Sequence, residues 1–202
     1  MIDVGNSAFA TTILAALFPV YLPSLVPPEG VTLSVFGASW QTSAISLWGY
    51  AVSLSLILTL LMAPIIGAWA DENALRKKLL GIFTFLGAGA SVALGFCDTW
   101  KSALVCFVVA NIGFSASNIF YNSLISSVAE EKEWHSLSLK GFAWGYIGGG
   151  VLLAINLLMI QRFEWFAFES KKAAVEASFM SVGIWWAAFT VPSLLLIREY
   201  SA

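Results

Sequence analysis

The sequence predicts an all-α integral membrane protein, built as a bundle of six transmembrane helices. Of its 202 residues, 59% are hydrophobic and only 11% are charged, which is too little polar side chain to cover a soluble globule. The mean hydropathy is +0.83. The charged residues gather in short segments between long apolar runs, and none lies between Gly30 and Ala70. This distribution is typical of helices that cross a lipid bilayer.

Six apolar runs are long enough to span a membrane as helices, and we expect them to form a single domain. The first is preceded by no Lys or Arg, since the first basic residue is Arg76. We therefore expect this run to be a span and not a cleaved signal peptide. A loop of small and polar residues should follow it. The predicted spans are residues 4–25, 42–69, 79–97, 102–128, 141–161 and 177–197.

Several classes of function are disfavoured by the composition. The net charge is −2, and the sequence offers no basic face for nucleic acid. Cys97 and Cys106 lack the spacing of a metal site or a disulfide framework. No HExxH motif, nucleophile elbow or pair of intramembrane carboxylates is visible, so we expect neither an enzyme nor a bound cofactor or metal.

The basic residues predict an orientation in the membrane. Six lie on the side of the cluster at Arg76 and four on the other, which favours both termini in the cytoplasm. We expect the membrane to be a bacterial plasma membrane. Residues 129–140 are then expected to form a second cytoplasmic loop, with His135 as a loop residue. The six are Arg76, Lys77, Lys78, Lys132, Lys140 and Arg198, and the four are Lys101, Arg162, Lys171 and Lys172.

The fourth predicted span carries a polar stripe. Asn111, Ser115, Asn118 and Asn122 are separated by four, three and four positions, which places them on one face of a helix. Such a face should turn toward protein or water and not toward lipid. Two interpretations remain open, a wall of a solute cavity and a structural contact between helices. Tyr121 lies beside the stripe and could add an aromatic surface.

Two polar residues open the first span. Asp3 and Asn6 have the positions of a helix-capping acid and a polar residue of the first turn. Alternatively, Asp3 is a membrane carboxylate that couples transport to protons. An ionised Asp inside a bilayer costs about 3 kcal/mol on insertion scales, so that role requires a partner or a wet cavity.

The fifth predicted span opens with small residues at regular intervals. Gly141, Gly145 and Gly149 are each four positions apart. Small residues repeated in this way allow two helix backbones to approach closely. We therefore expect this stripe to pack against a neighbouring helix.

The turn between the second and third spans reads G-A-W-A-D-E-N-A-L-R-K-K from Gly67 to Lys78. Arg76 and Lys77 lie within reach of the Asp71 carboxylate, so the segment could latch two helices. The simpler alternative is a loop that only fixes the orientation in the membrane. The order of small residue, acid and basic cluster resembles the loop between helices 2 and 3 of major facilitator superfamily transporters, although Ala74 stands where glycine is usual.

A wider resemblance covers the chain. The segments D-V-G-N-S-A-F-A-T-T-I-L (residues 3–14), N-I-F-Y-N-S-L-I (118–125) and K-G-F-A-W-G-Y-I-G-G-G (140–150) resemble the vacuole effluxer-like family of that superfamily. The resemblance implies the N-terminal half of a carrier made of two six-helix halves, each a 3+3 inverted repeat. It also implies secondary active transport of small solutes, with amino-acid efflux as the activity attached to fungal vacuolar members.

The resemblance implies partners as well as an activity. These are the lipid bilayer, a small-molecule solute and a second six-helix half, with Asn6, Asn111, Ser115, Asn118, Tyr121 and Asn122 as candidates to line the cavity. Two alternatives remain. The chain could form a homodimeric carrier of six-helix subunits, or it could be a truncated fragment that does not transport.

Overall fold

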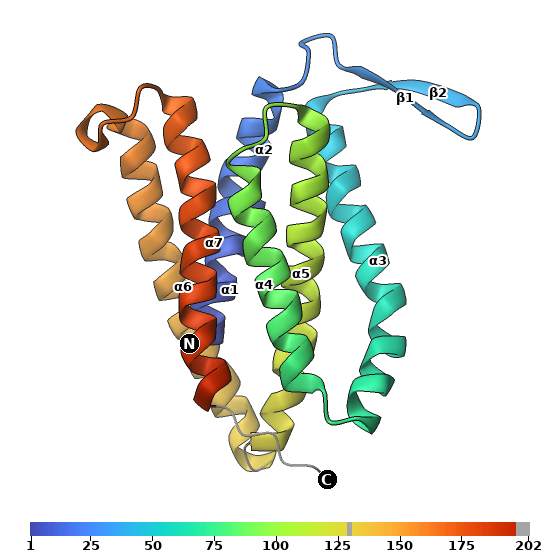
Figure 1. Cartoon of the computed structure of the whole chain (residues 1–202), viewed down its shortest axis with the longest axis vertical. Coiled ribbons are helices and arrows are strands. Elements are labelled where there is room, and N and C mark those ends of the chain that lie inside the picture. Colours follow the sequence, from blue (N-terminus) through green and yellow to red (C-terminus); the bar gives the residue numbers. More distant parts are fainter. Residues whose placement is uncertain (129–130, 197–202) are drawn as a thin grey trace.

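A bundle of long helices that run up and down makes up the structure (Figure 1). The computed structural model describes residues 1–128 and 131–196, and the side chains of 1–124 and 134–196. In this part of the chain, six helical segments are long and apolar enough to cross a membrane, which confirms the predicted fold class. They are Ile2–Ser24, Ala44–Glu72, Arg76–Leu94, Trp100–Leu124, Trp134–Gln161 and Lys171–Leu196.

The first span is not a uniform α-helix. It consists of α1 (Ile2–Ala8), a π-helical segment η1 (Phe9–Leu17), α2 (Phe18–Tyr21) and a final 3-10 turn η2 (Leu22–Ser24). Pro19 and Pro23 lie near its end. Because proline has no N–H, the backbone cannot keep a regular α pattern there, and wider and tighter turns replace it.

A β-hairpin joins the first span to the second, where we had predicted a loop. Strands β1 (Val31–Val35) and β2 (Ala38–Thr42) pair antiparallel, with Val35 opposite Ala38. Both residues of the turn have positive φ, 51° at Phe36 and 86° at Gly37, as a two-residue hairpin turn of type I′ requires. The prediction was wrong because the small and polar residues here alternate with Val and Leu, and this alternation favours a strand.

Helices α3 (Ala44–Glu72) and α4 (Arg76–Leu94) form the next two spans. The Oγ of Ser43 caps α3 by accepting a hydrogen bond from the backbone N–H of Ser46 at 3.3 Å. With 29 residues, α3 is about 43 Å long at 1.5 Å per residue and therefore exceeds the hydrocarbon core. The short turn after it places Ala74 at φ 51°, a left-handed conformation that explains why glycine is usual at this position.

The last three spans are α5 (Trp100–Val128), α6 (Glu131–Gln161) and α7 (Lys171–Leu196), with the 3-10 turn η3 (Phe163–Phe166) before α7. The predicted loop at residues 129–140 is wrong over most of its length, because α6 begins at Glu131. His135 is therefore an exposed helical residue. Apolar length indicates where a helix enters the membrane, whereas Glu, Lys and Leu extend the helix beyond that point. Arg198 lies outside the described residues.

The buried core lies along the first span, α4, α5 and α7. Phe18 and Phe107 stack with ring centroids 4.2 Å apart, and Trp186 of α7 is fully buried against Phe9. In contrast, only 17% of the most apolar window of α3 and 28% of that of α6 are buried, against 56% for α4. Figure 1 shows α3 and α6 on opposite flanks of the bundle. The first span thus lies in the centre, where α5 and α6 can both contribute to a site beside it.

Candidate functional site

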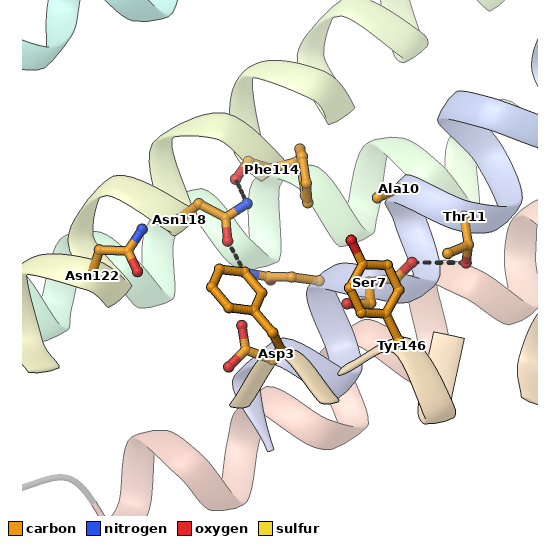
Figure 2. Close-up of a pocket in the computed structure, with 10 residues that line it drawn as sticks. Asp3, Ser7, Ala10, Thr11, Phe114, Asn118, Asn122 and Tyr146 are labelled. Carbon is orange, nitrogen blue, oxygen red and sulfur yellow. Dashed lines mark hydrogen bonds between the residues drawn. The ribbon is translucent and has the colours of Figure 1, made fainter. Parts of the chain in front are cut away.

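A polar cavity of about 300 Å³ lies between the first span, α5 and α6. Figure 2 shows its side chains, which come from the first span, α5 and α6. Three aromatic rings, those of Phe114, Phe142 and Tyr146, share the lining. The polar lining residues are Asp3, Asn6, Ser7, Thr11, Asn118 and Asn122.

The first span supplies one polar edge of the cavity. Asp3, Ser7 and Thr11 are four positions apart and share one helix face. The hydroxyl of Thr11 donates to the carbonyl oxygen of Ser7 at 2.8 Å and lies 3.3 Å from that of Gly149 on α6. Thr11 falls in the π-helical segment η1, and π-helical turns occur frequently at functional sites.

Asn6 and Asn118 connect three helices through one hydrogen-bonded chain. Nε1 of Trp186 donates to Oδ1 of Asn6 at 2.5 Å, and Nδ2 of Asn6 donates to Oδ1 of Asn118 at 3.0 Å. Nδ2 of Asn118 in turn donates to the carbonyl oxygen of Phe114 at 3.0 Å. Most of the hydrogen bonds of the two amides therefore connect helices, and they hold the first span, α5 and α7 together.

Asn122 differs from these two asparagines. It lines the same cavity but is exposed, and its side chain makes no hydrogen bond to another residue whose side chain the structure describes. Its amide donors and carbonyl oxygen are therefore available to a solute.

Asp3 is the carboxylate of the cavity. It is 6% exposed, and its Oδ2 accepts a hydrogen bond from the hydroxyl of Tyr121 at 2.5 Å. Asp3 also lies in the first turn of α1, where the helix dipole favours a negative charge. None of the described lining residues is Lys or Arg. The N-cap of α1 is Met1, without a side-chain cap hydrogen bond, so Asp3 is not the helix-capping acid of the first alternative. The carboxylate has a neutral partner and a polar opening, and the titrating role fits this position.

The other residues of the predicted stripe lie apart from the cavity. Asn111 is 2% exposed, and its Nδ2 donates to Oγ of Ser55 on α3 at 2.6 Å. Ser115 is half-buried and does not line the opening. Tyr121 reaches the site only through Asp3. The stripe therefore fits both interpretations, each over part of its length. Asn111, near the middle of α5, makes a structural contact with α3, whereas Asn118 and Asn122, closer to its C-terminal end, line the cavity.

The glycine stripe of α6 packs on the first span. A Cβ at Gly149 would lie 2.9 Å from the backbone of Ser7, and a Cβ at Gly145 would lie 2.6 Å from Oγ of Ser7. At Gly141 a Cβ would collide with the Asp3 carboxylate and lie 2.9 Å from the Tyr121 hydroxyl. Only glycine allows α6 to approach closely enough to close this side of the cavity.

The predicted latch contains an ion pair. Nε of Arg76 lies 2.6 Å from Oδ1 of Asp71, and Nη1 of Arg76 donates to the carbonyl oxygen of Ser123 on α5 at 3.4 Å. Arg76 thereby connects the end of α3 to α5. Lys77 follows as a half-buried residue, and Gly67 lies one turn before Asp71 with open space where a Cβ would be.

Six lining residues were not among the sequence candidates: Ser7, Ala10, Thr11, Phe114, Phe142 and Tyr146. Ser7 and Thr11 could have been found, because they continue the spacing of Asp3 along one helix face. Phe142 and Tyr146 gave no comparable signal, since aromatic residues on an apolar helix face lipid as readily as a cavity.

Comparisons with known proteins agree with this architecture. The sequence model of the family described as "Vacuole effluxer Atg22 like" matches residues 1–136 and 126–202. An uncharacterized MFS-type transporter of Bacillus subtilis, YxiO, is 30% identical over 98% of this chain and 45% of its own length. Autophagy-related protein 22 of Coccidioides immitis is 22% identical over 94% of this chain and 39% of its own length. An uncharacterized protein of Aquifex aeolicus is 24% identical over 98% of this chain and 44% of its own length.

The chain spans less than half the length of these curated relatives. No solved structure matches it. The six-helix bundle is half of a major facilitator fold. Because the family model covers the chain throughout, the resemblance is confirmed, and the chain belongs to the vacuole effluxer Atg22-like family.

Proposed function

We propose that this chain is the N-terminal half of a secondary active transporter of small solutes, and that the polar cavity is one wall of its solute path. The observation that carries the proposal is the cavity itself, which gathers a carboxylate, hydroxyls and amides at one place in a largely apolar bundle. Polar groups at membrane depth are costly unless they face protein or water, and they mark solute and ion pathways.

The lining favours a small zwitterionic or polar solute, in keeping with amino-acid efflux. The Asp3 carboxylate suits an ammonium group, while Ser7 and Asn122 offer hydrogen bonds to a polar side chain or carboxylate. A cavity of about 300 Å³ falls at the lower end of the range for small-molecule sites. A second half would enclose the solute from the other side.

Two charged sites would link solute movement to conformational change. Asp3 can take up a proton in the open cavity and give it up on the other side of the membrane, which supplies the coupling. The Asp71–Arg76 pair joins the end of α3 to the start of α4. Breaking that pair as the two halves rock would release one gate state.

The missing wall can come from either of two sources. One is a separate C-terminal half, and the other is a second copy of this chain. Helices α3 and α6 expose apolar flanks, and either partner or lipid can cover them. We propose that both termini lie in the cytoplasm, on the basis of the basic cluster at Arg76, and that the membrane is a bacterial plasma membrane, in keeping with the bacterial relatives.

The proposal is tested by two measurements on the purified chain. Solute binding is measured in nanodiscs as thermal stabilisation by each member of a panel of amino acids. Solute flux is measured as counterflow of the same radiolabelled amino acids in proteoliposomes. Asn122→Ala is compared with the unsubstituted chain in both measurements. It removes an amide from the cavity lining that hydrogen-bonds to no other described side chain.

The outcomes separate the alternatives. Binding with counterflow, both weakened by Asn122→Ala, supports a carrier that works as a homodimer, and a native mass of two chains would agree. Binding without counterflow supports a half that needs a partner. If no amino acid binds and none is carried, the proposed function is wrong, and the truncated, non-transporting fragment becomes the better interpretation.

A further inference from the structure

The β1–β2 hairpin has one apolar face and one polar face. The register pairs Leu33 with Trp40 and Val35 with Ala38, and these four side chains lie on the same face because strand residues alternate. The opposite face carries Thr32, Ser34, Ser39 and Gln41. No residue of either strand is charged. On the apolar face Leu33 packs against the bundle core, whereas Val35, Ala38 and Trp40 are exposed, so packing within the chain accounts for only part of this division.

The tip of the hairpin exposes an aromatic ring at a strained position. Phe36 is fully exposed, and its φ of 51° lies in the left-handed region. Asparagine, aspartate or glycine satisfies this turn position at lower cost. Neither the turn geometry nor packing within the described chain accounts for a phenylalanine here. We therefore infer that the Phe36 ring is stabilised by apolar contacts with something outside the chain.

The apolar face continues onto the lipid-facing surface of the bundle. Leu33 lines an apolar groove of about 310 Å³ together with Leu47 and Leu54 of α3 and Leu104 and Val105 of α5. Leu54 is 50% exposed and Val105 64% exposed. These helices cross the membrane, so the groove opens toward acyl chains. In Figure 1 the hairpin extends sideways from the end of the bundle, over the flank formed by α3.

We propose that the hairpin is an interfacial membrane anchor, which lays Phe36 and Trp40 into the headgroup layer of a phospholipid bilayer while its Ser, Thr and Gln face remains in water. Aromatic side chains favour this layer, because their apolar rings leave water there without entering the hydrocarbon core. The anchor lies in the leaflet opposite the Asp71–Arg76 turn, since α3 runs from the hairpin to that turn. It would hold the first span and α3 at a fixed depth.

The test measures the depth of single positions by spin labelling. Phe36→Cys and Trp40→Cys are each labelled with a nitroxide in phosphatidylcholine nanodiscs, and Ser34→Cys and Ser39→Cys are the matched controls on the other face. The unsubstituted chain measures background labelling of Cys97 and Cys106. Collision with oxygen, which concentrates in lipid, is compared with collision with a water-soluble nickel chelate.

The expected result is a contrast between the two faces. Labels at 36 and 40 should collide more with oxygen than with the nickel chelate, and labels at 34 and 39 should show the reverse preference. Equal access of the nickel chelate to all four positions would place the hairpin in water and overturn the proposal. Shielding of position 36 from both reagents would also overturn it, because that result indicates a protein partner in place of lipid.

Discussion

The hydroxyl of Tyr121 on α5 donates a 2.5 Å hydrogen bond to Oδ2 of Asp3 on α1. Gly141 of α6 adjoins the same two groups so closely that a Cβ there would collide with the carboxylate. Three helices therefore meet at one titratable group. We propose that adding or removing a proton at Asp3 changes the contact among all three, which would give a physical route from protonation to a change in helix arrangement.

Replacing Asp3 tests whether this group couples transport to protons. Asp3→Asn keeps the shape of the side chain and an oxygen that can accept the Tyr121 hydrogen bond, so the chain should still fold and insert. Because the amide cannot titrate, solute flux should lose its response to a pH gradient while counterflow without a gradient persists. Flux in proteoliposomes with and without an imposed gradient measures this difference.

Tyr121→Phe serves as the control for the hydrogen bond alone. It leaves the carboxyl able to titrate, so the response to the gradient should persist even if the rate falls. If Asp3→Asn retained a full response to the gradient, Asp3 would not be the group that couples transport to protons.

Asn6 and Asn122 line one cavity, but replacing each of them should have a different effect, on stability for Asn6 and on solute binding for Asn122. Asn6→Ala removes the acceptor of the buried Trp186 indole N–H, which costs about 1–3 kcal/mol when a buried donor is left without a partner. Asn122→Ala removes an exposed amide and should change stability by about 0.5 kcal/mol or less while weakening solute binding. Thermal unfolding in detergent and solute binding, measured on both variants, separate the two roles. Equal losses of stability in both would contradict this division.

Neighbouring glycines of α6 offer a direct test of close packing. An alanine Cβ at Gly149 would lie 2.9 Å from the Ser7 backbone, whereas one at Gly150 meets nothing within 4 Å. Gly149→Ala should therefore destabilise the chain by about 1–3 kcal/mol through overpacking. Gly150→Ala should be neutral or stabilise it by up to about 1 kcal/mol, since alanine is the better helix former. The measurement is the stability of both variants to unfolding in detergent. Equal changes in stability in the two variants would refute the packing role of Gly149.

The spans could be predicted because lipid imposes a simple rule on composition. A helix that crosses the membrane must be apolar over its length in the bilayer, and the run without charge from Gly30 to Ala70 meets that condition for α3. The same rule fails at helix ends. Helix α6 begins at Glu131, because charged residues that form helices well extend it beyond the lipid, where apolarity is no longer required.

The site was only partly predictable because helical spacing gives a face but not its neighbour. Asn111 and Asn118 share a stripe, yet Asn111 contacts Ser55 on α3 and Asn118 contacts Asn6 on α1. Whether Asn111 or Asn118 faces a cavity depends on how far along α5 the contact with α3 extends. That length is set by the packing of the whole bundle and not by the sequence of α5 alone. Ser7 and Thr11 are a different case, because the spacing of four from Asp3 along the first span already indicates them.

The Asp71–Arg76 pair should matter for turnover and little for stability. Asp71 is 56% exposed and Arg76 27% exposed in their side chains, and ion pairs at such a surface contribute about 1 kcal/mol or less. Asp71→Asn should therefore leave membrane insertion and thermal unfolding nearly unchanged. In a transport-competent assembly it should lower the rate of solute flux, because one gate state loses its latch.

Asp71→Glu is the matched variant, since it keeps the charge and can restore the contact with Arg76. Flux should recover with Asp71→Glu and also weaken at high salt in the parent chain, because screening reduces an exposed ion pair. Flux that was unchanged in Asp71→Asn, at normal insertion levels, would mean that this turn only orients the chain in the membrane and that the charge pair does not gate transport.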